Sequence, residues 1–373
     1  MKKARFGIVA AIAAVSLAFT GCTNADKTQD APTASAPAAE TSAPSEAATV
    51  ELADGVAKAK LNPVDADGKI EVTDAHGTQK ITPNPSKVVL LDNRTFETLE
   101  DWGIKPVAIP KKVTPSTIGW KSDDSVQDVG NHREPNYDVI TAADPDFVLV
   151  GQRFAQHYDD IKAAAPNAEI LDLNVDLPAK ATDPKAGESG QILVDGLAQD
   201  VLTLGQIFGH EADAAKLIND LNASIENARA GYKQGTKVLS VNTSGGKIGF
   251  LDPDVGRVYG PLYNLLGWEP ALSLESGTND HKGDEISEEA IAQANPDWIM
   301  ILDRDAAVGD SDKKKDGEAK KSVPGRELVE TSQALSNVTA VKEGNIYVAP
   351  ADTYTNEGIQ TFIEIFNDLA KLG

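Results

Sequence analysis

Two segments of the chain share one pattern, and this repeat limits the possible folds more than any other feature. Residues 143–153 (ADPDFVLVGQR) and 294–304 (ANPDWIMILDR) each contain x-Pro-Asp, four apolar residues, two further residues and a final arginine. A short, continuous apolar run of this kind is typical of a strand buried on both faces of a parallel sheet. The proline ends the preceding helix because it disfavours helical geometry in the residue before it. The repeat therefore predicts two copies of one α/β lobe.

The segments around the two strands also recur in the same order. SKVVLLD (86–92) is matched by TKVLSVN (236–242), and DWGIKPVA (101–108) is matched by LLGWEPAL (265–272). Helical patterns alternate with these apolar strands, which predicts mostly parallel sheets covered by helices on both faces. The chain length of 373 residues also suits two domains.

One long helical pattern separates the two halves. The apolar residues of segment 189–209 recur at helical spacing, and the segment is long enough to connect two lobes. We therefore predict an α/β fold with two Rossmann-like lobes, residues 62–188 and 210–373, joined by one long α-helix at 189–209. Because a single helix is stiffer than two or three connecting strands, we expect only modest closure of the lobes.

The N-terminus indicates export and a lipid anchor. Residues 1–21 begin with basic residues and continue as an apolar stretch of signal-peptide length. Cys22 is the only cysteine, which excludes a disulfide framework, and its context LAFTGC resembles the lipobox of bacterial lipoproteins. The alternative is a cleaved secretory signal that leaves a free thiol. Residues 22–61 are rich in Ser, Thr, Ala and Pro, which predicts a flexible, lipid-anchored tether.

The composition narrows the classes of partner and activity. The formal net charge is −22, which argues against nucleic acid as a partner because phosphate binding needs basic surfaces. The sequence contains no G-x-S-x-G, H-E-x-x-H or P-loop pattern, and its five histidines are spread along the chain. We therefore expect a binding protein rather than an enzyme.

The arginine at the end of each repeated strand is the part of the pattern that architecture does not explain. In open α/β sheets, ligands bind in the crevice beyond the carboxyl ends of the strands. Arg153 and Arg304 lie just past those ends, so two lobes facing each other would bring both into one cleft. An arginine at a strand end is more often a surface or ion-pair residue, but its duplication favours a ligand role.

Five segments carry a resemblance to a known family. They are VTDAHGTQKITPNPSKVVLLDN, REPNYDVITAADPDFVLVGQR, LGQIFG, ANPDWIMILDR and GNIYVAP. From residue 70 to the C-terminus the chain resembles the iron–siderophore substrate-binding lipoproteins of ABC importers, above all the branch that binds catecholate siderophores. The resemblance implies the class III periplasmic-binding-protein fold and a monomer without an intrinsic cofactor. It also implies that ferric siderophore is delivered, with its iron as cargo, to a permease dimer and its ATPase from the extracytoplasmic face of the membrane.

The resemblance also implies a set of ligand-binding residues. In the catecholate branch three arginines face a ferric tris-catecholate with a charge of about −3, and they correspond here to Arg153, Arg257 and Arg304. Arginine suits this role because its planar, weakly hydrated head tolerates burial and stacks on aromatic rings. His281 and Tyr354 correspond to residues that fill iron positions left open by a tetradentate siderophore. The sequence HKGDEIS around His281 is one residue longer than the family spacing.

Three further residues are expected at the cleft or on the surface of the lobes. Trp120, in STIGWKSDD, is expected to line the mouth of the cleft by stacking on the ligand. The resemblance also implies one carboxylate per lobe that docks to the importer. We expect Glu134 in the first lobe and Glu288 at the corresponding place of the repeat, while most other acidic residues serve solubility.

Other ligands for the same kind of cleft stay open at this point. Ferric citrate, haem and cobalamin are alternatives to a ferric siderophore. The three arginines favour a compact polyanion over haem, whose iron needs an axial ligand and whose ring needs an apolar slot.

Overall fold

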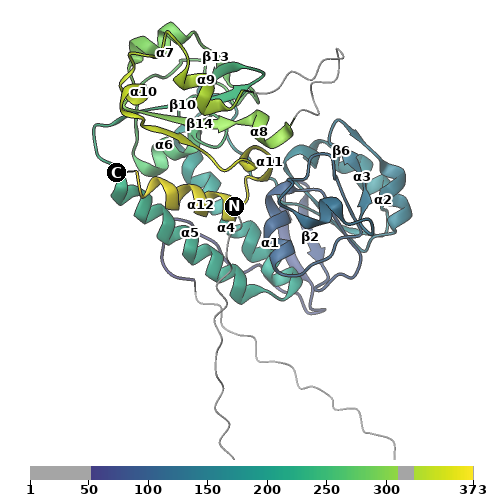
Figure 1. Ribbon diagram of the computed structural model, residues 1–373. Helices are drawn as coiled ribbons and strands as arrows, with labels where there is room; N and C mark the ends of the chain where they lie inside the picture. Colours follow the sequence, from purple (N-terminus) through teal and green to yellow (C-terminus); the bar gives the residue numbers. More distant parts are fainter. Residues whose placement is uncertain (1–51, 310–322, 373) are drawn as a thin grey trace, which may run out of the picture. The chain divides into compact units, whose positions relative to one another are not determined.

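A computed structural model describes residues 52–309 and 323–372 of the chain (Figure 1). The predicted signal peptide (1–21), Cys22 and most of the predicted tether lie outside the described residues. Within the described part, no helix is both long and apolar enough to cross a membrane.

The first lobe is built on a parallel sheet of five short strands. Its order is β5-β4-β3-β8-β9, and every neighbouring pair is parallel. The strands are β3 (Val88–Leu90), β4 (Ala108–Ile109), β5 (Gln127–Asp128), β8 (Phe147–Val150) and β9 (Glu169–Asp172). A hairpin of β1 (Ile70–Asp74) and β2 (Gly77–Ile81) lies beside β9.

Helices cover both faces of this sheet because alternate side chains of each strand point to opposite faces. Leu90 belongs to a buried cluster with α1 (Phe96–Asp101), whereas its neighbour Val89 belongs to a cluster with α2 (Tyr137–Ala143) and α3 (Tyr158–Ala164). The uniformly apolar strands are therefore buried on both sides, as the sequence predicted.

The second lobe contains the same parallel core with an added antiparallel part. Its order β12-β10-β14-β15 repeats the order β4-β3-β8-β9 of the first lobe, with all neighbours parallel. Two strands paired antiparallel beyond β10 were not predicted. The parallel strands are β10 (Lys237–Ser244), β12 (Glu269–Pro270), β14 (Trp298–Asp303) and β15 (Ile346–Val348), and the antiparallel ones are β11 (Lys247–Phe250) and β13 (Asp284–Glu285).

The helices of the second lobe also divide between the two faces of its sheet. Residues of the connecting helix and of three further helices form one buried cluster with β10 and β14, and residues of three others form the cluster on the opposite face. The first set is α5 (Glu211–Gly231), α6 (Gly260–Leu266) and α12 (Ile359–Leu369), and the second is α7 (Glu288–Ala294), α9 (Gly325–Glu330) and α10 (Thr339–Glu343).

The repeated x-Pro-Asp segment has the same geometry in both lobes. α2 and α7 each end at a residue in the left-handed conformation directly before the proline, Asp144 (φ 46°, ψ 60°) and Asn295 (φ 45°, ψ 63°). Short polar residues tolerate this conformation better than most others. Asp146 and Asp297 then accept a backbone N–H at the start of β3 (2.9 Å) and of β10 (2.8 Å). The repeated residues therefore form the same helix-to-strand turn in both lobes, and each turn is hydrogen-bonded to the neighbouring strand, β3 or β10.

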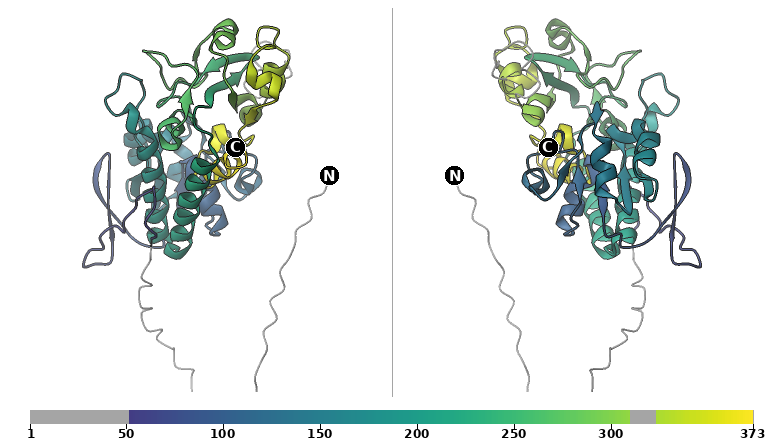
Figure 2. Two further views of the ribbon diagram at one scale, coloured as in Figure 1. Left: turned by 90° about the vertical axis from the view of Figure 1, so that its left-hand side faces the viewer. Right: turned by 90° about the vertical axis from the view of Figure 1, so that its right-hand side faces the viewer.

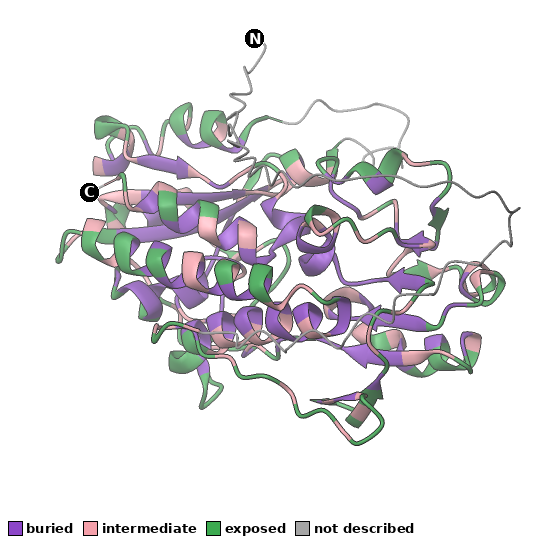
Figure 3. Cartoon of the chain, turned by 90° about the horizontal axis from the view of Figure 1, so that it is seen from below, coloured by how far each residue is buried: buried purple, intermediate pink, exposed green. Residues whose placement is uncertain are grey.

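α4 (Ser189–Phe208) contributes to the cores of both lobes. Leu193 and Leu197 belong to a buried cluster of the second lobe, whereas Ile207 and Phe208 belong to a cluster of the first. α5 runs beside α4 (Figure 2), and the inward sides of the long helices are buried (Figure 3). The predicted fold of two α/β lobes connected by a long helix is confirmed.

Residues 52–61 differ from the predicted tether because they pack along α4 and α5. Ala57 is only 3% exposed, and its N–H is donated to Asn222 Oδ1 of α5 (2.7 Å). The N–H of Lys58 is donated to Asp195 Oδ1 of α4 (2.6 Å). Polar side chains of the two helices thus satisfy the backbone of this segment. The segment belongs to the folded body rather than to a tether.

Two further contacts connect the lobes beside α4. α11 (Thr353–Asn356) reaches the first lobe, where Asn93 Nδ2 donates a hydrogen bond to the carbonyl of Thr355 (3.0 Å). The N–H of Ala181 in the first lobe also donates a hydrogen bond to the carbonyl of Gly277 (2.9 Å). The lobes are therefore held at more places than the connecting helix alone.

Candidate ligand-binding site

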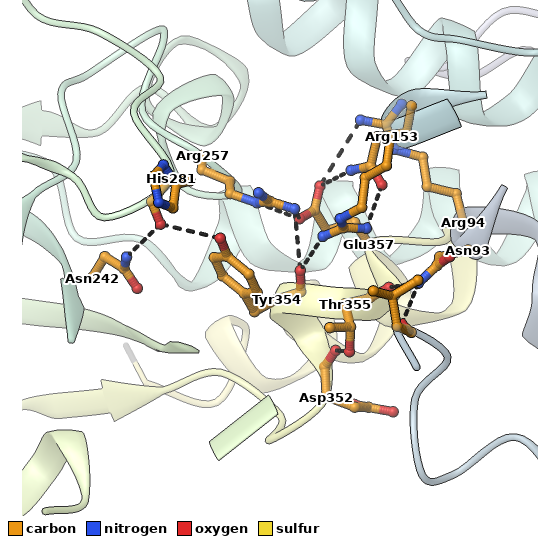
Figure 4. A network of polar contacts seen from close by, with 12 residues as sticks. Asn93, Arg94, Arg153, Asn242, Arg257, His281, Asp352, Tyr354, Thr355 and Glu357 are labelled. Atoms are coloured by element: carbon orange, nitrogen blue, oxygen red, sulfur yellow. Dashed lines mark hydrogen bonds and ion pairs between the residues drawn. The ribbon is translucent and has the colours of Figure 1, made fainter. Parts of the chain in front are cut away.

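Three arginines that are far apart in the sequence converge on Tyr354. Arg153 Nη2 and Arg257 Nη2 both donate to the backbone carbonyl of Tyr354, at 2.9 and 3.1 Å (Figure 4). Arg257 Cζ lies 4.2 Å from the centre of the Tyr354 ring, and Arg304 Cζ lies 5.3 Å from it. Both distances are within the range of cation–π attraction. The structure thus brings the three predicted arginines together.

Each arginine is positioned by a strand end or by a tight loop. Arg153 follows β8 in the 3-10 helix η3 (Gln152–His157), and Arg304 begins α8 (Arg304–Val308) directly after β14. Arg257 lies in the loop before α6 and follows Gly256. A side chain cannot replace this glycine, because a Cβ would lie 2.6 Å from the backbone of the preceding turn.

The backbone adopts rare conformations at three places around the arginines. Gln152 (φ 40°), Val258 (φ 65°) and Glu357 (φ 50°) are left-handed, which is uncommon for residues other than Gly, Asn and Asp. Each costs on the order of 1–3 kcal/mol, so the surrounding contacts must hold it in place. Such residues cluster at ligand-binding sites. Here two of them directly adjoin Arg153 and Arg257.

A fourth arginine and a carboxylate complete the cluster, and the sequence analysis missed both. Glu357 forms an ion pair with Arg257, and its Oε2 accepts a hydrogen bond from Gln152 Nε2 (2.9 Å). Arg94 Nη2 lies 3.9 Å from the same Oε2. The side chains of Arg94 and Glu357 are each only 8% exposed. Neither Nε nor Nη1 of Arg94 has a hydrogen-bond partner among the described residues.

The sequence position of Arg94 does indicate a place in the site. It lies in the 3-10 helix η1 (Asn93–Thr95), just beyond the end of β3, so its position resembles those of Arg153 and Arg304. Glu357 carried no comparable signal, because its partners Arg257 and Gln152 are 100 and 205 residues away in the sequence.

The cluster is strongly positive at neutral pH. Burial, and then the positive charge of Arg257, lowers the pKa of Arg153 to about 10, so Arg153 remains protonated. Burial, and then the charge of Arg153, lowers the pKa of the nearby His132 to about 4, so His132 adds no charge. Four arginines and Glu357 together give a net charge of +3 (4 − 1).

Two carboxyl groups, Asp92 of the first lobe and Asp200 of α4, interact electrostatically with Arg94. Burial raises the pKa of Asp92, and the charge of Arg94 partly opposes this shift. Burial also raises the pKa of Asp200 on α4, and the charge of Asp92 adds to that shift. Both groups are therefore shifted toward their neutral forms. Among the described residues, Glu357 is the only carboxylate that forms an ion pair with Arg94 within 4 Å.

His281 and Tyr354 are linked, but not as two free iron ligands. The Tyr354 hydroxyl donates a hydrogen bond to the backbone carbonyl of His281 (3.2 Å). The same carbonyl accepts a hydrogen bond from Asn242 Nδ2 (3.0 Å; Figure 4). The His281 side chain is 47% exposed, with Nδ1 3.6 Å from Asp280 Oδ2. The described residues contain no group of three or more His, Cys, Asp or Glu arranged to hold a metal ion. Tyr354 therefore contributes its ring and carbonyl to the cluster, while its hydroxyl is already engaged.

Trp120 does not lie where the sequence analysis expected it. Its side chain is buried in the core of the first lobe, in the 3-10 helix η2 (Gly119–Ser122), and is 6% exposed. The ring packs edge-on against Phe96 with 5.9 Å between the ring centres. Because this face is occupied by the core, Trp120 is not placed to stack on a ligand, and we remove it from the site.

The repeat assigns the two docking candidates differently from the sequence analysis. α2 and α7 have the same length, and their first residues Tyr137 and Glu288 are 151 residues apart, as are Arg153 and Arg304. Glu134 therefore corresponds to Glu285, which is exposed like Glu134. Glu288 corresponds to Tyr137, and its carboxylate accepts a hydrogen bond from Ser332 Oγ. The expected correspondence of Glu134 and Glu288 is wrong by three residues.

Two cavities between the lobes differ in charge. One, of about 280 Å³, is lined by Arg94, Arg257 and Glu357, with Leu193 of α4 and Phe362 of α12 in its wall. This volume is close to the lower limit of small-molecule pockets, about 300 Å³. The other, of about 440 Å³, has an acidic wall that disfavours an anion, formed by Glu97, Glu100, Asp101, Asp352 and Glu364.

Comparison with known proteins agrees with the fold and with the class of site. Residues 88–353 match the family described as periplasmic binding protein. The chain belongs to the periplasmic binding protein family. Members of this family bind ligands, so the chain is a binding protein and not an enzyme.

Several relatives of this periplasmic binding protein are known by their ligands. The petrobactin-binding protein YclQ of Bacillus subtilis is 29% identical over 294 residues, which cover 76% of this chain and 81% of YclQ. The ferric-anguibactin-binding protein FatB of Vibrio anguillarum is 26% identical, with coverages of 79% and 84%. The Fe(3+)-citrate-binding protein YfmC of Bacillus subtilis is 24% identical, with coverages of 80% and 84%.

The crystal structure of YclQ has the same fold. Its similarity to this chain has a TM-score of 0.66 at 23% sequence identity, and it covers 82% of this chain and 98% of YclQ. The chain therefore has the class III periplasmic-binding-protein fold, with two α/β lobes.

Proposed function

We propose that this periplasmic binding protein captures a ferric siderophore in the cleft between its lobes and delivers it to an ABC importer. The observation that carries the proposal is the convergence of Arg153, Arg257 and Arg304 from both lobes around Tyr354. A partly buried cluster that sets four arginines against one carboxylate suits a compact polyanion. The relatives YclQ and FatB, whose names give petrobactin and ferric anguibactin as ligands, support this class of ligand.

A catecholate siderophore suits the cluster best. Guanidinium groups stack on aromatic faces and keep their charge at physiological pH. Arg257 and Arg304 already lie within cation–π distance of one aromatic ring, so catechol rings of a ligand would make contacts of the same kind. In this proposal the ferric iron is cargo, and the protein has no cofactor of its own.

A tetradentate siderophore would leave iron positions open for His281 and Tyr354. The imidazole of His281 is 47% exposed and would have to leave Asp280 Oδ2, 3.6 Å away, to reach the iron. The Tyr354 hydroxyl would first have to leave the carbonyl of His281. We therefore propose His281 as the iron-proximal donor and assign Tyr354 a role through its ring and carbonyl.

Ferric citrate is a second candidate, and the size of the cavity favours it. The cavity beside Arg94 and Arg257, about 280 Å³, is small, and a citrate complex is smaller than a tris-catecholate. The relative YfmC, named for Fe(3+)-citrate, supports the same alternative. A tris-catecholate would extend from this cavity toward Arg153 and Arg304.

Anchoring and docking complete the proposal. We propose that lipidated Cys22 attaches the monomeric protein to the extracytoplasmic face of the membrane. We further propose that Glu134 and its counterpart Glu285, one on each lobe, meet basic groups of the permease dimer, whose ATPase drives transport. Glu285 takes the place that the sequence analysis gave to Glu288.

A titration with defined ferric complexes tests the proposed function. The purified protein is titrated with a ferric tris-catecholate, a ferric hydroxamate, ferric citrate, haem and cobalamin, and the quenching of its four tryptophans is recorded. Saturable quenching by the tris-catecholate with sub-micromolar Kd is expected, and ferric citrate should bind more weakly. Tight binding of haem or cobalamin without binding of any ferric siderophore would contradict the proposal.

A further inference from the structure

Glu357 is a buried carboxylate inside a site that we propose for an anion. Its side chain is 8% exposed, and its backbone is left-handed (φ 50°). A buried charge and a rare backbone conformation both oppose folding, so specific partners must hold this residue. Those partners are Arg257 and Gln152, with Arg94 slightly farther away.

Glu357 occupies donors that the ligand would need. It is ion-paired with Arg257 and accepts a hydrogen bond from Arg257 Nε. Arg257 Nη2 is also donated to the carbonyl of Tyr354. An anionic ligand that binds the Nε and Nη2 edge of Arg257 therefore competes with Glu357.

Arg94 is the second arginine close enough to form an ion pair with Glu357. Its Nη2 is 3.9 Å from Glu357 Oε2, about 1 Å beyond an ordinary hydrogen bond. Its Nε and Nη1 have no hydrogen-bond partner among the described residues, and buried donors without partners are costly. A carboxylate across one edge of a guanidinium forms two parallel, charge-assisted hydrogen bonds. A small movement of Glu357 would give Arg94 the partner that it lacks.

From these contacts we propose that Glu357 is an internal counter-ion that exchanges partners when the ligand binds. Without ligand it neutralises Arg257, and with ligand it pairs with Arg94 and leaves Arg257 to the ligand. The three arginines that face the ligand then carry a charge of +3, while Arg94 and Glu357 form a neutral pair. Because Arg94 lies in the first lobe and Glu357 in the second, the new pair would also join the lobes. This inference rests on the proposed function and makes Glu357 a residue that determines ligand charge.

A double-mutant cycle tests the exchange. Kd for a ferric tris-catecholate is measured by tryptophan quenching in the wild type, Glu357→Gln, Arg94→Gln and the double variant, and unfolding of each variant without ligand is recorded as a control. Glu357→Gln is expected to bind on the order of tenfold more tightly, because a nearby negative charge that repels the ligand is gone. Arg94→Gln is expected to bind on the order of tenfold more weakly, because Glu357 loses its alternative partner.

The double variant separates the exchange from simpler roles. In the Glu357→Gln background, Arg94→Gln should change Kd by less than about twofold, because no carboxylate then needs Arg94. Equal weakening by Arg94→Gln in both backgrounds would mean that Arg94 contacts the ligand directly, which overturns the inference. Weaker binding by Glu357→Gln would mean that Glu357 only positions Arg257, which also overturns it.

Two further readouts keep the test decisive. If Glu357→Gln does not fold, Glu357→Asp is used, because it keeps the negative charge on a shorter side chain. Glu357→Asp should weaken ligand binding less in the Arg94→Gln background than in the wild type. A crystal structure with ligand should show Glu357 paired with Arg94 and separated from Arg257, and an intact Arg257–Glu357 pair contradicts the exchange. If the wild type binds the tris-catecholate but the effects of Glu357→Gln and Arg94→Gln on Kd are additive, only the inference fails. If no variant binds any ferric complex, the proposed function fails as well.

Discussion

At the scale of single residues, the site combines charge with strain. Four arginines and one carboxylate share a small volume around Tyr354, and rare backbone conformations at Gln152 and Val258 aim the arginines next to them. Such conformations lower the stability of the fold and persist only where neighbouring contacts enforce them. Gln152 and Val258 therefore have backbone conformations that fit the site at a cost in stability.

The role assigned to Tyr354 predicts the effect of removing its hydroxyl. Tyr354→Phe keeps the ring and the carbonyl that accepts Arg153 and Arg257, and it loses only the bond to the carbonyl of His281. Kd for a ferric tris-catecholate should rise by less than about fivefold, since a hydrogen bond contributes about 1 kcal/mol. A loss of the charge-transfer band of a tetradentate ferric complex in this variant, but not in His281→Ala, would instead make the hydroxyl an iron ligand.

Asp252 predicts a pH dependence of stability in the loop that carries Arg257. It is 2% exposed, and burial raises its pKa to about 6 from an ordinary value of 3.8. The folded protein therefore holds this proton more tightly than the unfolded chain does. The resulting stabilisation is complete below about pH 4 and is lost as the pH rises through 6.

Asp252→Asn removes this titration. The variant should be more stable than the wild type at pH 8 by about 1–3 kcal/mol, and the difference should vanish near pH 4. Urea unfolding at both pH values measures it. A stability difference of the same size at pH 4 and pH 8 would show that packing, and not the charge, is responsible.

At the scale of elements, helices α4 and α5 bind a segment, residues 52–61, that the sequence predicted to be part of a flexible tether. The segment 52–61 lies on α4 and α5, where Asn222 both accepts the N–H of Ala57 and donates to its carbonyl. This segment follows the Ser-, Thr-, Ala- and Pro-rich stretch directly and was grouped with it, because the sequence does not reveal that polar side chains of distant helices satisfy its backbone. The antiparallel strands β11 and β13 were missed because the five-stranded sheet of the first lobe contains no counterpart of them, so the repeat does not reveal them.

The contact between Ala57 and Asn222 predicts a measurable loss of stability. Asn222→Ala leaves the buried N–H of Ala57 without a partner, which should cost about 1–3 kcal/mol. Asn219→Ala is the matched control, because Asn219 makes an exposed bond to Ala53 in the same segment and should cost less than about 1 kcal/mol. Chemical unfolding compares the two, and equal effects would mean that residues 52–61 do not pack on α5 as described.

The repeat explains which parts of the fold and site were accessible from the sequence. The two α/β lobes and the positions of Arg153 and Arg304 follow from local patterns that recur in both halves of the chain, so both were predicted. Trp120 was misplaced because a sequence does not distinguish an aromatic side chain in a core from one at a surface. Glu357 was missed because its role depends on contacts between the two lobes that have no local pattern.

At the scale of the whole molecule, the contacts between lobes predict little movement on binding. α4 contributes to both cores, α11 is tied to the first lobe through Asn93, and Ala181 is bonded to Gly277. The backbone should therefore move by no more than about 1 Å, as in other pre-organised complexes. Small-angle scattering with and without ferric ligand measures this, and a clear decrease in the radius of gyration would contradict modest closure.

The central claim is that the arginines around Tyr354 bind a ferric siderophore, and one measurement tests it most directly. Kd for a ferric tris-catecholate is determined at low and high ionic strength for the wild type, for the variant Arg153→Gln/Arg257→Gln/Arg304→Gln, and for the control Arg229→Gln. Arg229 lies in the last turn of α5, where its Nε donates a hydrogen bond to the carbonyl of Leu265 in α6.

The account predicts sub-micromolar binding that weakens with salt in the wild type and in Arg229→Gln. The triple variant should bind at least about a hundredfold more weakly and lose most of the salt dependence, because three charge-assisted contacts are gone. A triple variant that folds and binds the tris-catecholate as tightly as the wild type would contradict the account.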